Sequence, residues 1–288
     1  MTLENYVKCF TFTLLFGLLT GVSFASADLP KGALSYPVLV VLEDGSTASG
    51  FYLTDKSNYY FVTARHVVFN EPQFTLRSKT ITLTSYSDEI ENPKKIEIKM
   101  NFDALLKDNL VRYHKAHDVA VVYMGIVEKL DGGKTRNVFS TKYIQLQNNS
   151  EGNMCSANTL WIKMFSQVLV GNEAFIFGYP RSLGIKEIQQ IDYERPLLRK
   201  GIIAGKNIHN KTIILDCPVY YGNSGGPVIQ VDQEGLSKTF LPIGVVSQFV
   251  PFVEEWENKN LRYSNITISN SGYSVVVPMD VVLELLWK

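Results

Sequence analysis

The most constraining feature of this sequence is the spacing of its short apolar runs. About a dozen segments rich in Val, Ile, Tyr, Phe and Thr follow one another, with turn residues between them. In Lys79–Tyr86 (KTITLTSY), Thr alternates with apolar residues, which is the period of a strand with one buried face. The pattern predicts an all-β fold of the barrel or sandwich class. The expected strands are Tyr36–Leu42, Gly50–Leu53, Tyr59–Thr63, Lys79–Tyr86, Lys95–Met100, Val119–Met124, Ala174–Gly178, Leu197–Ala204, Thr212–Leu215, Pro227–Val231, Ile243–Ser247 and Tyr273–Val277.

One segment with a clear helical pattern lies at the C-terminal end. Pro278 suits the opening of a helix, and Asp280 suits the positive end of its dipole. We expect this helix to pack against a barrel through an apolar stripe. The stripe consists of Val281, Val282, Leu285 and Leu286.

A polar stretch at Gln147–Asn158 divides the expected strands into two groups of similar size. Such a stretch is typical of a linker between two subdomains. We therefore expect an N-terminal β-barrel in residues 28–150 and a C-terminal β-barrel with the terminal helix in residues 151–288.

The first 27 residues have the pattern of a secretory signal. Cys9–Phe24 is an uncharged run of sixteen residues, and Ala25-Ser26-Ala27 provides small residues for cleavage after Ala27. An uncleaved anchor is the competing interpretation, but the run is shorter than the roughly 20 residues of a spanning helix. We expect a secreted or periplasmic protein without a stable membrane anchor after cleavage.

The charge balance narrows the classes of partner. Lys and Arg number 28 and Asp and Glu number 28, so the formal net charge is zero. A neutral chain lacks the basic field that attracts phosphate backbones, and we expect no nucleic-acid binding. The sequence leaves the oligomeric state open.

Two cysteines remain in the expected mature chain, Cys155 and Cys217. An exported protein folds where disulfides form, so a bond between them is one interpretation. Two buried thiols are the other, because sequence spacing does not fix the distance between the Cα atoms.

The segment with the most chemical information is Tyr221–Ile229 (YGNSGGPVI). Glycines on both sides of Ser224 allow a sharp turn and the close approach of another molecule. If the turn aims the N–H groups of Gly222 and Ser224 at one point, they form an oxyanion hole beside the Ser224 hydroxyl. Taken alone, the segment also fits a glycine-rich hairpin loop.

A serine hydroxyl needs a base, and His66 in FVTARHVV follows an expected strand directly. Asp118 in HDVAVVYM opens another strand and is placed to accept a hydrogen bond from the imidazole. Each has an ordinary alternative, a structural histidine and a turn aspartate. The chain order His66, Asp118, Ser224 differs from that of subtilisin-like and α/β-hydrolase enzymes.

With these three segments in register, the chain resembles the chymotrypsin/trypsin-like serine peptidases, and within them the bacterial trypsin-like and high-temperature-requirement type. The resemblance implies two six-stranded antiparallel β-barrels with the active cleft between them. It places His66 and Asp118 on the first barrel and Ser224 on the second. The matching segments are Ser49-Gly50-Phe51, Thr63–Val67, Asp118–Val121, Gly178-Tyr179-Pro180, Gly222–Pro227, Ile243–Ser247 and Gly272–Leu286.

The sequence departs from the animal trypsins at several points. Asn223 precedes the expected nucleophile, where those enzymes carry an acid that pairs with a newly cut N-terminus. We therefore expect activity without a further cut before Tyr36. Val67 follows His66 in place of a cysteine, and we expect no PDZ module after the protease region.

The resemblance also suggests the substrate-binding residues. It places the base of the primary pocket near Pro218, which offers no carboxylate to a substrate Lys or Arg. Ser247-Gln248-Phe249 matches the strand that pairs with substrate backbone, and Phe249 stands where a glycine often leaves the pocket open. We expect small or medium apolar side chains at the cleavage position. Val250–Arg262 is interpreted as a solvated insertion loop and not as a lid.

These expectations lead to an exported serine endopeptidase that acts on proteins or peptides through an acyl-enzyme and needs no metal or cofactor. Two other classes remain open. One is a catalytically silent binding protein on the same scaffold, and the other is an esterase that uses the same three residues.

Overall fold

The computed structural model describes residues 33–87, 92–129, 135–147, 154–180, 189–235, 237–258 and 263–287. The expected signal segment, residues 1–27, lies outside these ranges. Among the described residues, no helix has the length and apolar character needed to cross a membrane.

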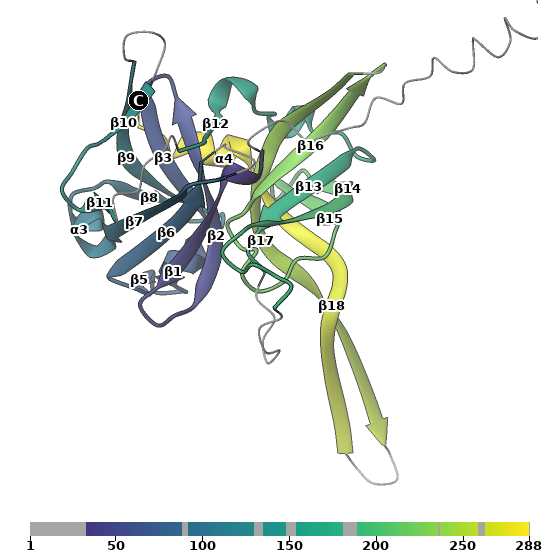
Figure 1. Ribbon diagram of the computed structural model, residues 1–288. Coiled ribbons are helices and arrows are strands. Elements are labelled where there is room, and N and C mark those ends of the chain that lie inside the picture. The colour runs from purple at the N-terminus through teal and green to yellow at the C-terminus, as the bar shows by residue number, and fades with distance from the viewer. Residues whose placement is uncertain are drawn as a thin grey trace, which may run out of the picture.

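The N-terminal half is one curled ten-stranded sheet (Figure 1). Its main path runs β10-β9-β3-β2-β1-β6-β7-β11, with β12 added beside β2 and β8 beside β9. All pairs are antiparallel except β12 with β2. The strands are β1 Pro37–Leu42, β2 Thr47–Asp55, β3 Asn58–Thr63, β6 Thr80–Tyr86, β7 Lys95–Asn101, β8 Val111–Tyr113, β9 Ala120–Lys129, β10 Thr135–Phe139, β11 Ile144–Leu146 and β12 Ala157–Asn158.

Strands β2 and β3 are buried on both faces, which explains their nearly continuous apolar sequences. Tyr52 and Phe61 point into the core of the first barrel, whereas Phe51 and Tyr60 belong to a second cluster on its outside. The β2–β3 pair therefore contributes side chains to two apolar clusters, one inside the first barrel and one on its outer surface. A two-stranded hairpin, β4 Phe69–Asn70 and β5 Thr75–Leu76, lies apart from the main sheet.

The C-terminal half forms a closed barrel of six strands in the order β13-β14-β15-β18-β17-β16. Its core includes Ile176, Ile213, Leu215 and Val246, none of which has measurable exposure to solvent. The strands are β13 Glu173–Gly178, β14 Leu197–Asn207, β15 Thr212–Asp216, β16 Pro227–Glu234, β17 Ser237–Asn258 and β18 Tyr263–Pro278.

The C-terminal helix α4 covers the outer cluster of the first barrel. Its first residue follows Pro278, as expected, and the carboxylate of Asp280 accepts a hydrogen bond from the Phe165 N–H at 2.6 Å. The guanidinium of Arg112 donates to the carbonyl oxygens at the end of the helix and lies 4.0 Å from the Trp287 ring centre. The helical elements are η1 Ala33–Ser35, α2 Arg65–Val68, α3 Phe102–Lys107, η3 Thr159–Trp161, η4 Phe165–Gln167 and α4 Met279–Glu284.

Strands β17 and β18 continue beyond the barrel as a two-stranded arm (Figure 1). The prediction of a solvated insertion loop at 250–262 is wrong for the described part of that segment. Pro251–Asn258 is a strand that pairs with Tyr263–Asn270. The sequence carries only part of the reason: Ile266 and Ile268 alternate with polar residues, whereas Phe252 and Val253 are adjacent and break the alternation. We call these two paired segments the arm.

The all-β architecture with two barrels and a C-terminal helix is confirmed. The second barrel has the six strands expected, whereas the curled first sheet has ten among the described residues. The helix α3 was missed: it is short, and its beginning is marked by Asn101, whose side chain accepts from the Ala104 N–H at 3.0 Å. The boundary at residue 150 stays a prediction, although β12 lies beyond it and still pairs with the first sheet.

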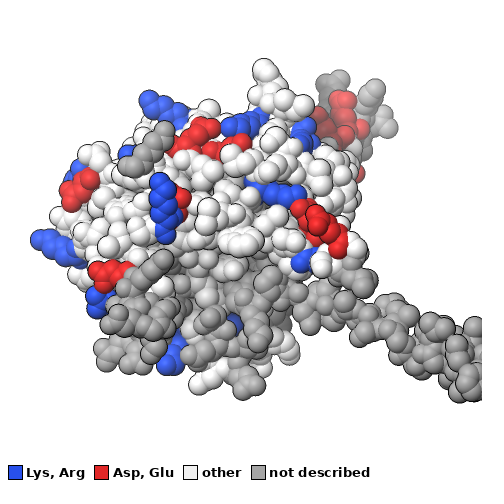
Figure 2. All heavy atoms as spheres, turned by 90° about the horizontal axis from the view of Figure 1, so that it is seen from above, with Lys and Arg blue, Asp and Glu red and all other residues white. Residues whose placement is uncertain are grey.

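The surface charges follow the neutral composition. Figure 2 shows cationic and anionic side chains interspersed on the face seen from above, separated by wide uncharged areas. No field of one sign dominates that face among the described residues.

Candidate active site

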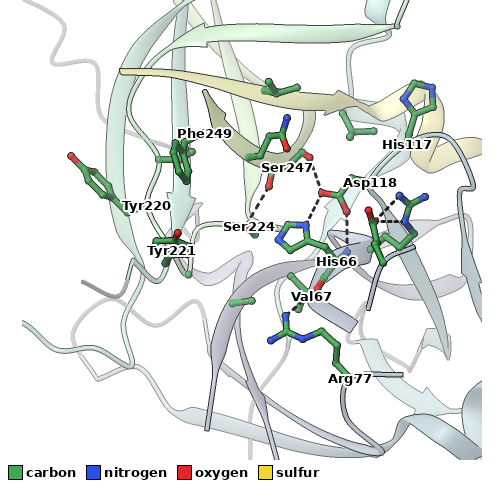
Figure 3. A pocket seen from close by; sticks show the side chains of 18 of the residues that line it. His66, Val67, Arg77, His117, Asp118, Tyr220, Tyr221, Ser224, Ser247 and Phe249 are labelled. Atoms are coloured by element: carbon green, nitrogen blue, oxygen red, sulfur yellow. Dashed lines mark hydrogen bonds and ion pairs between the residues drawn. The ribbon is translucent and has the colours of Figure 1, made fainter. Parts of the chain in front are cut away.

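The candidate site is a cleft of about 920 Å³ between the two barrels (Figure 3). Three of its lining residues, His66, Asp118 and Ser224, come from separate parts of the sequence. The structure thus brings the three expected catalytic residues to one cavity. The expected substrate strand Ser247–Phe249 and the oxyanion residue Gly222 line the same cleft.

His66 lies in the short helix α2, which begins two residues after β3 ends. The ring Nδ1 is 2.7 Å from Asp118 Oδ2, and the main-chain N–H of His66 donates to Asp118 Oδ1 at 2.9 Å. An ionised carboxylate only accepts hydrogen bonds, so Nδ1 carries the proton of the neutral imidazole. The other ring nitrogen, Nε2, is left as the basic one.

Asp118 is held from a second side by the Ser247 hydroxyl, which donates to Oδ2 at 2.7 Å. Burial opposes ionisation of this carboxyl and is the largest influence on it, but the hydrogen bonds from His66 and Ser247 outweigh it. The pKa of Asp118 is therefore lowered from its ordinary value. The side chain stays ionised at neutral pH and can stabilise a positive charge on the imidazole.

Ser224 lies in the turn that precedes β16. Its hydroxyl donates to the Ser247 carbonyl oxygen at 3.3 Å, and among the described residues no hydrogen bond joins it to the His66 ring. Figure 3 shows the serine beside the imidazole, on the side away from Asp118. A rotation about the Cα–Cβ bond redirects such a hydroxyl between staggered positions. Proton transfer from Ser224 to His66 stays a prediction.

The backbone before Ser224 forms a type II turn. Asn223 N–H donates to the Tyr220 carbonyl oxygen at 2.9 Å, and Gly222, at the third position of the turn, has φ +95°. That φ value is the one that a type II turn requires and that glycine adopts without strain. The Asn223 side chain closes the same turn, because its Oδ1 accepts from the Tyr220 N–H at 3.0 Å.

Two N–H groups in this turn are available for a ligand. Among the hydrogen bonds of the described residues, none uses the N–H of Gly222 or the N–H of Ser224. These are the two donors expected for an oxyanion hole. Asn223, with 1% exposure, is buried beneath them and occupies its place through neutral hydrogen bonds.

Ser49 on strand β2 fastens the turn to the first barrel. Its hydroxyl donates to the Gly222 carbonyl oxygen at 2.6 Å and accepts from the Tyr179 N–H at 2.9 Å. Its own N–H donates to the Ser224 carbonyl oxygen at 2.9 Å. A side chain at Gly225 would lie 2.1 Å from the Ser49 carbonyl oxygen, so only glycine allows this approach.

The expected primary pocket is narrowed by aromatic rings. The Phe249 ring packs against the core of the second barrel, and its centre lies 6.1 Å from that of Tyr221 in an edge-on arrangement. Pro218, the expected base of the pocket, does not line the cleft, whereas the next two residues, Val219 and Tyr220, do. The assignment of Pro218 stays a prediction without a contact to support it.

Two positioning residues were not assigned from the sequence. Ser49 belongs to a motif that was noted but was given no role. Arg65, the residue before His66, is almost fully buried; it pairs with Glu71 at 2.6 Å and donates to the carbonyl oxygens of His114 and Lys115. It thereby ties His66 to the loop before Asp118. The signal available in the sequence was a charged residue within the apolar segment FVTARHVV, next to the candidate base.

The other expected features have simple outcomes. Cys155 and Cys217 are not joined by a disulfide, and Cys217 is part of the second core. Of the two interpretations, the structure favours separate thiols.

Within the described ranges, no group of three or more His, Cys, Asp or Glu residues is arranged to hold a metal ion.

Solved structures with a similar chain path include the HtrA-type protease AlgW with tripeptide, with 14% identity and a TM-score of 0.47 over 88% of this chain and 59% of that one. The serine endoprotease from Yersinia pestis has 15% identity and a TM-score of 0.42, covering 88% and 61%. The protease Anisep from Arthrobacter nicotinovorans has 15% identity and a TM-score of 0.45, covering 88% and 94%. This chain thus spans less than two thirds of the length of the first two proteins.

No curated protein matches the sequence. The family model described as the trypsin-like peptidase domain matches residues 48–236, which contain all three expected catalytic residues and both expected oxyanion donors. Because that match covers more than half of the sequence, the chain belongs to the trypsin-like peptidase domain family.

Proposed function

We propose that this peptidase cleaves peptide bonds within polypeptides, with Ser224 as nucleophile, His66 as general base and Asp118 as the group that orients it. The observation that carries the proposal is a pair of hydrogen bonds between His66 and Asp118, in the cleft that Ser224 also lines. His66 Nδ1 lies 2.7 Å from Asp118 Oδ2, and the main-chain N of His66 lies 2.9 Å from Asp118 Oδ1. These two hydrogen bonds fix the orientation of the imidazole ring and leave Nε2 unprotonated.

In the first half of the reaction, Ser224 Oγ attacks the substrate carbonyl carbon while its proton moves to His66 Nε2. The C=O π electrons move to the oxygen, and the N–H groups of Gly222 and Ser224 donate to that oxyanion. The carbonyl re-forms, the C–N bond breaks, and His66 gives its proton to the leaving amine. Water then repeats the sequence on the acyl-enzyme and releases the acid.

The substrate assignments rest on the strand at the cleft wall. Ser247–Phe249 lines the cleft, and a substrate backbone can pair with it as an added strand. The Phe249 and Tyr221 rings narrow the adjoining space. We assign small or medium apolar side chains to the cleavage position.

The proposal includes export. The apolar run Cys9–Phe24 and the small residues at Ala25-Ser26-Ala27 support cleavage after Ala27 and a secreted or periplasmic location. Expression in a bacterial host, followed by N-terminal sequencing of the exported protein, should give Asp28 as the first residue. Full activity of that product, without a further cut before Tyr36, is expected because Asn223 holds the oxyanion turn through neutral hydrogen bonds.

A fluorophosphonate probe tests the chemistry directly. The mature chain should form an adduct on Ser224, cleave a mixture of peptides and keep its activity in a chelator. Ser224→Ala should abolish both the adduct and the cleavage. A folded, unlabelled protein would contradict the proposal and favour a silent binding protein, whereas labelling with turnover of activated esters alone would favour an esterase.

A further inference from the structure

Beyond the cleft, strand β17 has a long open edge. β17 pairs with β16 only as far as Val245, whereas on its other side it pairs with β18 as far as Asn258. The edge that faced β16 is therefore without a partner strand among the described residues from Ser247 onward. Unpaired strand edges present rows of N–H and C=O groups that accept a further strand.

This open edge is continuous with the cleft. Ser247, Gln248 and Phe249 line the cleft and form the first part of the edge. The arm follows after two shifts of register, between Val246 and Gln248 and between Phe249 and Pro251. Pro251–Asn258, eight residues, extends the edge by about 27 Å at the rise of an antiparallel strand.

Both faces of the arm carry exposed apolar side chains. Residues directly opposite in an antiparallel pair share a face, so Val253 and Ile268 lie together on one face. The other face carries Phe252 and Trp256. At least half of the surface of each of these four side chains is exposed, whereas apolar residues on a free surface usually occur singly. A two-stranded ribbon of this kind has little core of its own, and a third strand at its edge would add side-chain neighbours to the apolar rows on both faces.

The charge of the arm is acidic. Glu254, Glu255 and Glu257 lie on β17, and the two paired segments contain no Lys or Arg, although Lys259 and Arg262 stand between them in the sequence. Two arms from two copies of this chain would bring these carboxylates together, and like charges on neighbouring strands are destabilising. The carboxylates likewise oppose insertion into a lipid layer. A basic or neutral partner strand suits the arm.

We propose that the β17 edge of the arm binds an extended polypeptide substrate as an added strand, on the N-terminal side of the bond that is cleaved. This inference rests on the proposed function. The favoured substrate segment is unfolded and combines apolar with basic side chains. The direction follows from antiparallel pairing, which is the more stable arrangement. Because β17 runs from the cleft at Ser247 to the end of the arm at Asn258, an antiparallel substrate has its N-terminal part on the arm and its C-terminal part in the cleft.

Binding along this edge also explains how the enzyme selects its substrates when the primary pocket is small. The narrow space between Phe249 and Tyr221 distinguishes few side chains. Main-chain pairing along the arm adds binding free energy for a long extended chain and not for a short peptide. The expected substrates are thus unfolded segments with accessible backbone, and not compact folded proteins.

Peptide length and direction provide the first test on the unmodified mature protein. A cleavable core peptide is compared with the same core carrying eight alternating Val and Lys residues, either before or after the core. We expect the N-terminal extension to raise kcat/KM about tenfold or more and the C-terminal extension to leave it within about twofold. Replacing Lys by Glu, or methylating alternate backbone nitrogens of the extension, should remove the gain. Equal gains from both extensions would overturn the inference.

Arm variants provide the second test. The ratio of kcat/KM for the extended and core peptides should fall toward one in Val253→Ser/Ile268→Ser and fall in Glu254→Gln/Glu255→Gln/Glu257→Gln. Ile208→Ser and Glu234→Gln, which change exposed residues outside the arm, are the matched controls and should keep the wild-type ratio. An unchanged ratio in both folded arm variants would contradict the inference.

Two further measurements separate this inference from the proposed function. Fluorescence anisotropy with labelled peptide and Ser224→Ala should show tighter binding of the N-terminally extended peptide than of the core. If the wild type binds the extended peptide more tightly but cleaves no peptide, the proposed function is wrong and substrate binding by the arm stands. If the wild type cleaves the core peptide and the extension has no effect, the proposed function stands and substrate binding by the arm is wrong. Loss of a dimer in the arm variants, seen by sedimentation with an unchanged ratio, would assign the edge to a second copy.

Discussion

Ser49 and Ser247 hold the reactive groups of the site without being expected to react themselves. Ser247 donates to Asp118 Oδ2 at 2.7 Å, and Ser49 joins Gly222 to Tyr179 through its hydroxyl. Ser49 has no exposure to solvent, so water does not replace its bonds if the hydroxyl is removed, whereas Ser247 lines the cleft. The geometry of the site therefore depends on neutral hydrogen bonds around one partly buried carboxylate.

Ser49→Ala should weaken both folding and catalysis. The change leaves the Gly222 carbonyl oxygen and the Tyr179 N–H without their partner, which costs about 1–3 kcal/mol in the free energy of unfolding. It also frees the oxyanion turn, and a small misplacement there lowers kcat/KM by about tenfold to a hundredfold. Denaturant unfolding and peptide kinetics measure the two effects. Ser57→Ala, at an exposed turn, should change neither; equal values for both variants would refute the role of Ser49.

Among the elements, the turn Tyr220–Asn223 and strand β17 decide what the cleft can bind. In the turn, Gly222 adopts φ +95°, and no hydrogen bond among the described residues uses its N–H group or that of Ser224, the residue after the turn. Strand β17 contributes the Ser247 hydroxyl to the catalytic group, Phe249 to the pocket wall and then the open edge of the arm. One strand therefore links the chemistry to substrate selection.

Gly222→Ala should remove most of the oxyanion stabilisation. Alanine at φ +95° is strained, and the turn relieves that strain by rotating the peptide group whose N–H faces the cleft. We expect kcat to fall by about 100-fold or more, the usual effect of losing one oxyanion donor. Circular dichroism serves as the control for folding. A correctly folded variant with wild-type kcat would show that this N–H does not contact the oxyanion.

Phe249→Ala should widen the choice of side chain at the cleavage position. The ring packs against the second core and lies edge-on to Tyr221, so its removal opens space in the cleft that Ser224 also lines. Peptides with Phe or Leu at that position should gain about tenfold or more in kcat/KM relative to peptides with Ala. Tyr273→Ala, an exposed aromatic residue of β18, is the matched control. An unchanged preference in Phe249→Ala would place the primary pocket elsewhere.

For the whole molecule, the candidate active site lies at the junction of the two barrels. Ser49 and Asp118 from the first half bond to Gly222 and Ser247 from the second. The outer apolar cluster contains residues of both halves together with helix α4. Because the halves share this core and these hydrogen bonds, we expect them to unfold together and activity to be lost in the same transition.

Acid should destabilise the folded protein. A hydrogen bond with Lys200 lowers the pKa of Glu173, and the bonds from His66 and Ser247 lower that of Asp118 against the effect of burial. Groups whose pKa is lower in the folded state contribute stability above their ordinary values of 4.5 and 3.8, and lose it as the pH falls through the lowered values. The free energy of unfolding should therefore drop between about pH 5 and 2. Denaturant titrations check this, and a flat profile in that range would contradict it.

The sequence predicted the strands of both barrels well where apolar residues alternate or form short runs, as in Lys79–Tyr86. It failed for the arm and for α3, whose patterns are weak or brief. For the site, it named the residues that carry reactive groups, because hydroxyl, imidazole and carboxylate chemistry is readable from residue type and local glycines. It did not identify Ser49 or Arg65 as positioning residues, because their roles depend on partners distant in the chain.

The sequence by itself determined the all-β fold, the terminal helix and the family, since each depends on local periodicity or on motifs of a few residues. Only the tertiary structure decided how the oxyanion turn is held, which thiols stay apart and where strand β17 is left open. The physical reason is distance along the chain: Ser49 and Gly222 are 173 residues apart, yet their hydrogen bond sets the geometry of the turn. Such bonds exist only after both barrels have closed, so no local pattern specifies them.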